Sequence, residues 1–465
     1  MNLSKCLAIL LLLACVISGV GSVQAQPAGD IAYVVLGENG KPVARLLTTD
    51  EQCPRIRFDR REVQMDVRAK PESLPLRPTR SAPADSKPSV FPVLTCEKTI
   101  PDKTGSATIG GLILPMPVKE FKRIVVIGDT GCRLKKSDNA YQACNDGSLY
   151  PFAKIANAAA GWKPDLVIHV GDFLYRENAC AANNPGCVGS PWGYGWDAWQ
   201  ADFFTPGIAL LKAAPWVMVR GNHESCTRAG QGWWRMLDPR ALLTGRDCNA
   251  SVDDDKGDFS DPYAVPLGGA QLLVMDTSNT TDGIIPSGDI RQTRYWDLYN
   301  KLETLSQQAT YNIAVNHQPI LGLAATKNKQ GNVAVLPGNI GLQSVFGQIN
   351  PLLIPPRINV LLSGHVHTWQ EVSFSSPHPT QFITGFSGTM EDVVSLPAQL
   401  PTGATPAKGA VIEHLSSWTD GFGFMTMERK GSAQWEVKVW DANGKIRNTC
   451  IVEGSHSVCE LAKIN

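Results

Sequence analysis

The stretch Leu361-Leu362-Ser363-Gly364-His365-Val366-His367 joins an apolar run to a glycine and two histidines. On an extended backbone, residues i and i+2 point to the same side and lie about 6–7 Å apart. Two histidines in this arrangement can each bind one ion of a metal pair, whose members lie about 3.5–4 Å apart. The stretch therefore predicts part of a two-metal site at the end of a β-strand.

Most of the other short apolar runs in the sequence are likewise followed directly by polar residues. From residue 121 onward such runs alternate with longer amphipathic stretches, which is typical of an α/β fold. The predicted strands are 124–127, 166–170, 216–219, 272–275, 313–315 and 360–362, and the predicted helices are 148–160, 196–213, 290–308 and 340–350. Residues just past the C-terminal ends of parallel strands converge at one edge of a sheet, where α/β proteins bind ligands.

Several polar side chains are thereby expected to meet at this edge. They are Asp129, Asp172, Tyr175, Asn222, His317, His365 and His367. Their donors are oxygen and nitrogen atoms without a thiolate, which suits Fe, Mn or Zn. Alone, each residue is explained by packing or helix capping. Because two ions need about three or four ligands each and a shared one, the combination predicts a binuclear site.

The motifs around these residues resemble those of calcineurin-like metallophosphoesterases, over roughly residues 120–445. Within that superfamily they are most similar to purple acid phosphatases. Gly131 stands where other members have a metal-binding histidine, and Tyr175 follows Asp172 by three residues. Purple acid phosphatases share both features. The resemblance implies an α/β protein with an αββα metallophosphoesterase sandwich.

The resemblance also implies how the ligands divide between Fe(3+) and a divalent ion, which can be Fe, Zn or Mn. In this scheme Asp129, Tyr175 and His367 hold Fe(3+), Asn222, His317 and His365 hold the divalent ion, Asp172 bridges both, and His223 contacts the substrate. One departure is Ala314, where the family usually has valine. A second is that Asn316 and Gln318 flank His317, where a further histidine is common in the family.

The implied function is a secreted phosphatase, of the acid phosphatase type, that hydrolyses phosphate monoesters by attack of a metal-bound hydroxide. His223 is expected to donate a proton or hydrogen bond to the leaving oxygen, or else to orient a ligand. Glu224 is expected either to orient His223 or to have a structural role. Two alternatives remain: a di-zinc or di-manganese phosphodiesterase or nucleotidase on the same fold, and a non-catalytic secreted binding protein.

Residues 1–25 are predicted to be a signal peptide, with Lys5 before an apolar segment and Val23-Gln24-Ala25 at its end. The protein is therefore expected to be secreted or periplasmic. A lipoprotein anchor at Cys15 is less favoured, because apolar residues follow it. No later segment has the 18 or more apolar residues of a transmembrane helix.

The mature chain is divided into a β-rich accessory domain at 26–118 and a catalytic domain at 119–465. In the first, strands are predicted at 31–36 and 43–47 with a turn between them, and the Pro/Ser-rich segment 71–92 is predicted to be irregular. The remaining cysteines are even in number, which predicts disulfides in an exported protein. Spacing suggests the pairs Cys53–Cys96, Cys132–Cys144, Cys180–Cys187, Cys226–Cys248 and Cys450–Cys459.

The balance of charges argues against nucleic acid and anionic membranes as partners. Lys+Arg and Asp+Glu both number 43, so the formal net charge is zero. There is no basic excess to attract nucleic acid or an anionic membrane. Small phosphate esters are the expected substrates, and the sequence carries no indication of an oligomeric state.

Overall fold

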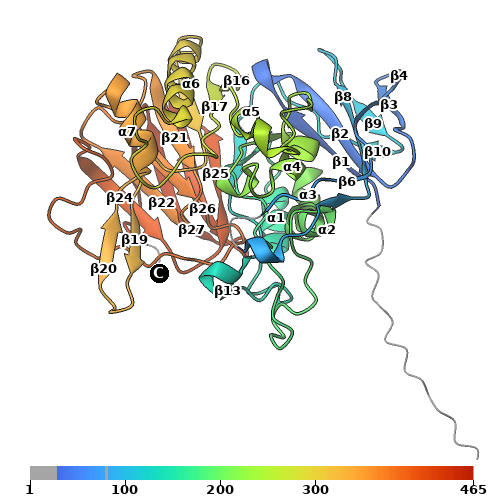
Figure 1. Cartoon of the computed structure of the whole chain (residues 1–465). Coiled ribbons are helices and arrows are strands. Elements are labelled where there is room, and N and C mark those ends of the chain that lie inside the picture. The colour runs from blue at the N-terminus through green and yellow to red at the C-terminus, as the bar shows by residue number, and fades with distance from the viewer. Residues whose placement is uncertain (1–28, 79–81, 464–465) are drawn as a thin grey trace, which may run out of the picture.

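Two β-sheets form the centre of the computed structural model, which describes residues 29–78 and 82–463 (Figure 1). The larger sheet has the order β28 (His456–Cys459), β27 (Ile446–Glu453), β26 (Gln434–Asp441), β25 (Gly423–Arg429), β11 (Arg123–Ile127), β14 (Leu166–His169), β15 (Trp216–Met218), β1 (Ile31–Leu36), β2 (Pro42–Thr48), β8 (Leu94–Thr99) and β5 (Asp66–Ala69). The smaller sheet has the order β16 (Tyr263–Pro266), β17 (Gln271–Val274), β18 (Asn312–Val315), β21 (Ile358–Ser363), β23 (Thr380–Thr384), β22 (Trp369–Phe374) and β24 (Ile412–Trp418).

The central strands of both sheets, such as β14, β15, β17 and β18, are buried on their two faces, which explains why they are mostly continuous apolar runs. Val126 of the larger sheet and Ile313 and Val360 of the smaller one lie in a shared core. Val125, on the opposite face of β11, lies in a second core with α1 (Phe152–Gly161) and α3 (Thr205–Leu211). A third core joins the smaller sheet to α6 (Ile290–Ser306) and α7 (Ile340–Ile349). These layers confirm the predicted αββα sandwich.

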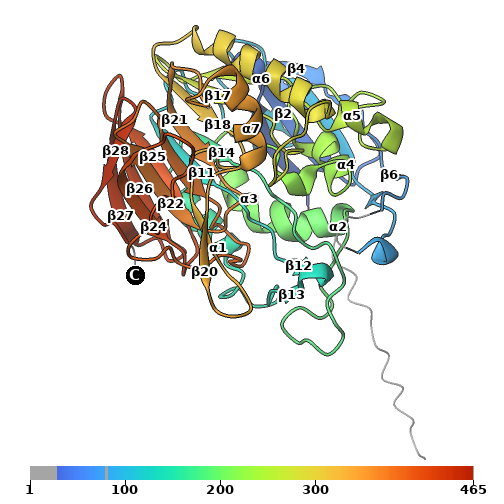
Figure 2. The same ribbon diagram turned by 60° about the vertical axis from the view of Figure 1, so that its left-hand side comes forward.

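The predicted helices are confirmed. Helices α1, α6 and α7 lie within the predicted ranges or differ from them by a few residues at their ends. The range 196–213 comprises α2 (Trp196–Trp199), a wider helical turn at 200–204 and α3. Figure 2 shows α6 and α7 together above the smaller sheet, with α2 and α3 on the other side of the molecule. Short helices α4 (Gly230–Gly232) and α5 (Asp254–Gly257) follow β15.

The N-terminal region contributes strands to the larger sheet as well as forming a small sheet of its own. Strands β1 and β2 and the turn between them are as predicted, and β1 pairs in parallel with β15 through Val35 and Trp216. The small sheet has the order β10 (Leu112–Ile113), β9 (Ala107–Ile109), β3 (Arg55–Phe58) and β4 (Arg61–Gln64). The larger sheet thus continues across residue 118, and the division into domains there stays a prediction.

Several short strand pairs complete the fold. They are β6 (Glu72–Ser73) with β7 (Val90–Phe91), β12 (Leu134–Lys135) with β13 (Ala140–Tyr141), and β19 (Ala324–Lys327) with β20 (Val333–Leu336). The first pair corrects the prediction for 71–92 at the two ends of that segment, which pair with each other, whereas most of the described residues between them are irregular as predicted.

All the disulfides suggested by spacing are confirmed. The structure has Cys53–Cys96, Cys132–Cys144, Cys180–Cys187, Cys226–Cys248 and Cys450–Cys459. The predicted signal peptide and Cys15 lie outside the described residues. Within 29–78 and 82–463, no helix is both long and apolar enough to cross a membrane.

Candidate metal centre

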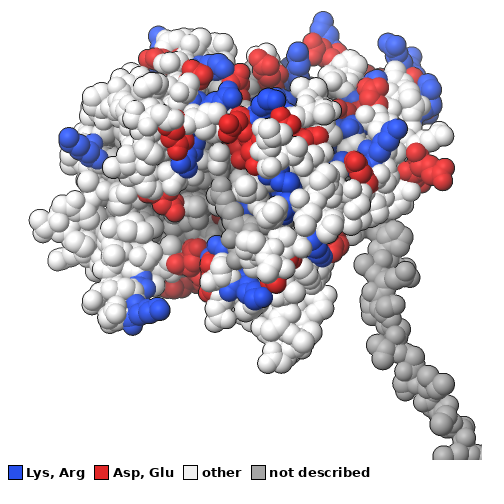
Figure 3. Space-filling view, in the orientation of Figure 1, with Lys and Arg blue, Asp and Glu red and all other residues white. Residues whose placement is uncertain are grey.

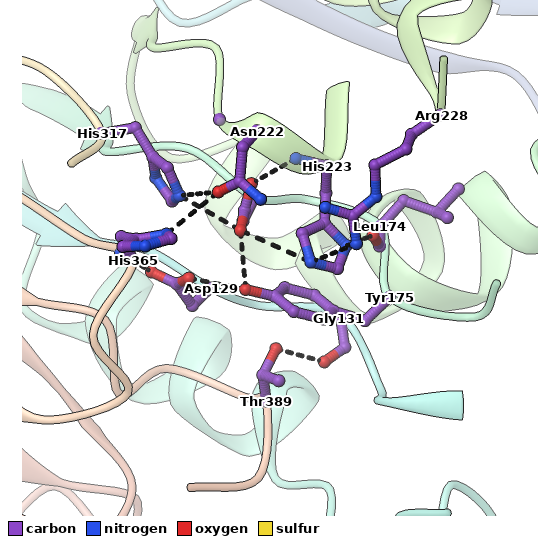
Figure 4. Close-up of polar contacts among 12 residues, drawn as sticks. Asp129, Gly131, Leu174, Tyr175, Asn222, His223, Arg228, His317, His365 and Thr389 are labelled. Atoms are coloured by element: carbon purple, nitrogen blue, oxygen red, sulfur yellow. Dashed lines mark hydrogen bonds and ion pairs between the residues drawn. The ribbon is translucent and has the colours of Figure 1, made fainter. Parts of the chain in front are cut away.

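The C-terminal ends of five strands meet at one place between the two sheets. Strands β11, β14 and β15 are adjacent and parallel in the larger sheet, and β18 and β21 are adjacent and parallel in the smaller one. The sequence predicted the edge of a single sheet, whereas the site lies where the edges of two sheets face each other. All the ligands predicted from the sequence are brought together there (Figure 4).

One group of donors surrounds the phenol oxygen of Tyr175. This oxygen lies 2.7 Å from Asp129 Oδ1, 2.8 Å from Asp172 Oδ2 and 2.9 Å from His367 Nε2. His367 Nε2 is 3.4 Å from Asp129 Oδ1. The four donors are therefore close enough to share one ion, and they are the set expected for the ferric site.

A second group surrounds the side-chain oxygen of Asn222. Asn222 Oδ1 lies 3.0 Å from both His317 Nε2 and His365 Nδ1. His317 Nε2 is also 3.1 Å from Asp172 Oδ2. Asp172 thus contacts members of both groups, as a bridging ligand must. The donor atoms of Asp172, His317 and His365 all lie within 4.8 Å of one another.

Backbone carbonyl groups fix the orientation of two histidines. His317 Nδ1 lies 2.9 Å from the carbonyl oxygen of Val170, and His367 Nδ1 lies 2.8 Å from that of Met390. A nitrogen that donates to a carbonyl oxygen leaves the other ring nitrogen unprotonated in a neutral ring. When the rings are neutral, their Nε2 atoms therefore face the centre with lone pairs, as metal ligation requires.

The backbone at the strand ends is held in an uncommon conformation. Asp129, Asp172 and His365 have φ values of 55°, 59° and 69°, in the left-handed region that side chains rarely adopt. Such strain is found where the surrounding structure requires a particular side-chain direction. A Cβ atom on Gly171 would lie 2.5 Å from His317 Nδ1, so only glycine allows the two sheets to approach here.

Glu224 has a structural role whose detail the sequence did not predict. Its Oε1 accepts hydrogen bonds from the backbone amides of Phe173 and Leu174, and its Oε2 accepts from those of Asp172 and Gly221. The carboxylate therefore holds the loop that carries Asp172. Of the two roles expected for Glu224, these contacts support the structural one, because other groups occupy the ring nitrogens of His223.

His223 lies at the rim of the centre between a carboxylate and a guanidinium. Its Nδ1 is 2.9 Å from the carbonyl oxygen of Leu174 and 3.1 Å from Glu177 Oε1, and its Nε2 is 2.6 Å from Arg228 Nη2. Burial and then the charge of Arg228 lower the pKa of His223 to about 4. The ring Nε2 also lies 3.8 Å from Asp172 Oδ2. The sequence indicated His223 but neither Glu177 nor Arg228, since no local pattern distinguishes them.

Two further supports come from segments distant in the sequence. Asp202, in the aromatic helical segment, accepts a hydrogen bond of 2.8 Å from the amide of Tyr175. Thr389, in the loop after β23, donates from its hydroxyl to the carbonyl oxygen of Gly131 and from its amide to that of Asp129. These contacts position the strand-end loops relative to one another.

The donor set fits bound cations. Asp129 and Asp172 are fully buried, and buried carboxylates need a compensating positive charge. Burial, followed by the charges of these two aspartates, raises the pKa of Tyr175 well above its usual range. Without a cation the phenol stays protonated, and its hydroxyl donates hydrogen bonds to the two carboxylates. A bound cation supplies the missing charge and favours the phenolate.

Two other groups of potential ligands in the described chain do not have this chemistry. They are Cys226 with Cys248 and Asp258, and Glu371 with His414 and Cys459. All three cysteines belong to disulfides. A disulfide sulfur is not a thiolate, and only the thiolate is a good metal ligand.

Comparisons with known proteins agree with this geometry. A family model for calcineurin-like phosphoesterases matches residues 122–369. Among solved structures, the purple acid phosphatase PPD1 from yellow lupin (Lupinus luteus) seeds has a TM-score of 0.55 and 13% identity, and the match covers 93% of this chain and 74% of that one. The structure of PhoD has a TM-score of 0.51 and 13% identity, and the match covers 93% of this chain and 92% of that one.

A search of curated proteins finds no significant match. At 13% identity the two structural likenesses bear on the fold, and they confirm the expected similarity to purple acid phosphatases at that level. The family model spans more than half of the chain. The chain therefore belongs to the calcineurin-like phosphoesterase family.

Proposed function

We propose that this protein hydrolyses phosphate monoesters at a binuclear metal centre of the purple acid phosphatase type. As a member of its family it is a metal-dependent phosphoric ester hydrolase. The preference for monoesters, the identity of the metals and activity at acidic pH are our proposal. The observation that supports it most strongly is the position of Asp172, whose Oδ2 lies 2.8 Å from the Tyr175 phenol and 3.1 Å from His317 Nε2.

In this proposal each ion has its own ligands and shares Asp172. Fe(3+) would be held by Asp129, Tyr175 and His367, and a divalent Fe, Zn or Mn ion by Asn222, His317 and His365. A pair of bound cations lowers the pKa of water and neutralises charge on phosphoryl oxygens. The phenol is the reason for proposing iron, since the other donors suit several metals equally well.

The protein's own groups would bind and orient the ester. The amide of His223 donates to Asp172 Oδ1 over 2.8 Å, which fixes the direction of the bridging carboxylate. The His223 ring would contact the substrate. To donate a hydrogen bond or proton to the leaving oxygen, its Nε2 must exchange the contact with Arg228 for a proton, which a pKa of about 4 allows only at acidic pH. Arg228 lies against this ring and is ion-paired with the buried carboxylate of Glu177, and the two side chains together would hold the ring in place.

Metal analysis together with a visible spectrum of the natively folded protein tests the proposal. We expect one iron and one divalent ion per chain, a pink to purple colour, and faster hydrolysis of p-nitrophenyl phosphate than of bis-p-nitrophenyl phosphate. A colourless protein that contains only zinc or manganese and prefers the diester would establish the phosphodiesterase alternative. If the metal-loaded protein hydrolyses neither compound, the result would favour the third alternative, a non-catalytic binding protein.

We further propose that the protein is exported, to the periplasm or the medium. The five disulfides support this, because disulfides persist in oxidising compartments. N-terminal sequencing of the mature protein from the exported fraction is expected to begin at Gln26. Full-length protein that remains in the reducing cytosol would contradict the proposal.

A further inference from the structure

An apolar pocket adjoins the candidate metal centre on the side of His365. It has a volume of about 280 Å³. Apolar side chains line most of it, namely Leu323, Ala324, Leu336, Pro337, Ile340 and Val366. The wall farthest from the centre is formed by the hairpin β19–β20 and the start of α7.

The pocket and the metal centre share one side chain. His365 lines the pocket, and its Nδ1 lies 3.0 Å from Asn222 Oδ1 within the second ligand group. Val366, between the two metal-facing histidines, lines the pocket as well. A group that enters the pocket is therefore directly beside a phosphate bound at the centre.

Two apolar side chains of this pocket are left partly open to water. Leu336 is 43% exposed and Ile340 is 38% exposed. Covering such side chains with an apolar group contributes about 25 cal/mol for each Å² removed from water. Figure 3 shows basic side chains near the tip of the β19–β20 hairpin and acidic side chains on its side toward the middle of the molecule, with an otherwise mostly uncharged surface. The pocket thus gains most from an apolar occupant.

The polar residues of the pocket do not favour a polar or anionic occupant. Among the described residues that line it, none is Lys or Arg, and Asp282 is the acidic one. Asn339 is already engaged, because its Oδ1 accepts from the amide of Leu342 over 2.9 Å and its Nδ2 donates to the carbonyl of Thr281 over 3.1 Å. A second phosphate would meet a carboxylate, and sugar hydroxyls would find few partners.

We propose that this pocket binds the organic part of the substrate, and that the substrate is a phosphate ester of an apolar alcohol, with an aryl or branched alkyl group. The inference rests on the proposed function, because it assumes that an ester phosphate binds at the metal centre. It specifies the class of alcohol, which the metal ligands alone do not. Nucleotides, polyphosphates and sugar phosphates are poor substrates in this account.

Two esters with similar leaving groups test the inference in the metal-loaded protein. The kcat/KM for 2-phenylethyl phosphate is expected to exceed that for ethyl phosphate by about tenfold or more, as is typical when a pocket accepts an added apolar group. Leu336→Ser and Ile340→Ser are each expected to lower this ratio by about threefold or more, because they reduce kcat/KM for 2-phenylethyl phosphate more than that for ethyl phosphate. Both side chains are partly exposed, so the variants should fold, and thermal unfolding checks this.

Val333→Ser is the matched control. Val333 lies on the same strand as Leu336 and is 47% exposed, but it does not line the pocket. This variant is expected to keep the ratio of the wild type. Any of three results overturns the inference and leaves the proposed function intact. They are a wild-type ratio near one, a ratio that Val333→Ser lowers as much as Leu336→Ser does, and a preference of the protein for nucleotides.

A binding measurement separates the inference from catalysis. Calorimetry of the metal-loaded protein is expected to show tighter binding of benzylphosphonate than of methylphosphonate, with the difference reduced in Leu336→Ser. If neither ester is hydrolysed, the proposed function fails, and the phosphonates alone then decide the inference. Equal affinity for the two phosphonates overturns it.

Discussion

The phenol oxygen of Tyr175 lies 2.7 Å from Asp129 Oδ1, although 46 residues separate them in the chain. The contact joins the loops after β11 and β14, which are neighbours in the larger sheet. A second carboxylate, that of Asp172, lies 2.8 Å from the same oxygen. Burying two carboxylates around one phenol costs free energy, and a cation that replaces the phenol proton would reduce this cost.

Tyr175→Phe tests whether this phenol is a ligand of iron. A ferric phenolate absorbs visible light, so the variant is expected to lose the colour of the wild-type protein and to bind iron less tightly. The measurements are a visible spectrum and metal analysis. Tyr299→Phe is the control, because Tyr299 is paired with Asn350, remote from the centre. A Tyr175→Phe protein that keeps its colour would refute the assignment.

Asp172→Asn tests the bridge. Asparagine keeps an oxygen that can accept from the amide of His223 but replaces the charged oxygen between the two ligand groups with an NH₂ group. Loss of several kcal/mol of charge stabilisation lowers kcat by about 10³-fold or more. Asp197→Asn, at a side chain that is 54% exposed, is expected to behave as wild type. Unchanged turnover in Asp172→Asn would contradict the bridging role.

His223→Gln distinguishes proton donation from positioning. If His223 assists the leaving oxygen, the variant lowers kcat by about 10²–10³-fold for alkyl phosphates. The loss is smaller for p-nitrophenyl phosphate, whose leaving group is stable without a proton. Kinetics with both substrates provide the measurement. Equal losses for the two substrates would show that the histidine only positions Asp172 or the substrate.

The strands, helices and ligands were predictable because each depends on local pattern. Strand β11 is apolar from Ile124 to Ile127 since both of its faces are covered there, and Asp129 follows its end. The order of strands in the two sheets was not predictable. The pairing of β1 with β15 joins segments 181 residues apart, at Val35 and Trp216, and no local pattern encodes it.

The supporting residues of the centre were missed for the same reason. Glu177, Arg228 and Asp202 act through contacts with residues elsewhere in the chain, and charged residues near a motif are most often on the surface. Glu224 was noticed because it follows His223, but its role depends on the loop after β14. The ligands, by contrast, were visible because a glycine and a strand end accompany most of them.

Glu224→Gln tests the carboxylate that holds this loop. The glutamine keeps one accepting oxygen, so two of the four backbone amides that now donate to Glu224 lose their partner. Each buried unsatisfied donor costs about 1–3 kcal/mol, so the free energy of unfolding is expected to fall by about 2–6 kcal/mol. The affinity for metal should fall by about 10–100-fold, because Asp172 is no longer held.

Denaturant unfolding and metal titration measure these effects. Glu303→Gln, on the exposed side of α6, is the control and should leave both quantities unchanged. If Glu224→Gln binds metal as tightly as the wild type does, the loop is held by other contacts and the assigned role is wrong.

His414 predicts a pH dependence of stability far from the metal centre. Its Nδ1 lies 2.7 Å from Oε2 of the buried Glu371, and this hydrogen bond raises the pKa of His414 above its usual value. The native state therefore binds the proton more tightly than the unfolded state, whose histidine pKa is about 6.5. The resulting stabilisation is complete below about pH 6.5 and is lost as the pH rises through the native pKa.

His414→Gln is accordingly expected to destabilise the protein more at pH 5.5 than at pH 9, and denaturant unfolding at the two pH values measures the difference. The same substitution in a Glu371→Gln background isolates the pair, because the carboxylate that accepts the hydrogen bond from protonated His414 is then absent. In that background the effect of His414→Gln should depend much less on pH, with only the backbone of Cys459 and the charge of Glu413 left to raise the pKa. If the pH dependence is undiminished without Glu371, the 2.7 Å contact is not its main cause.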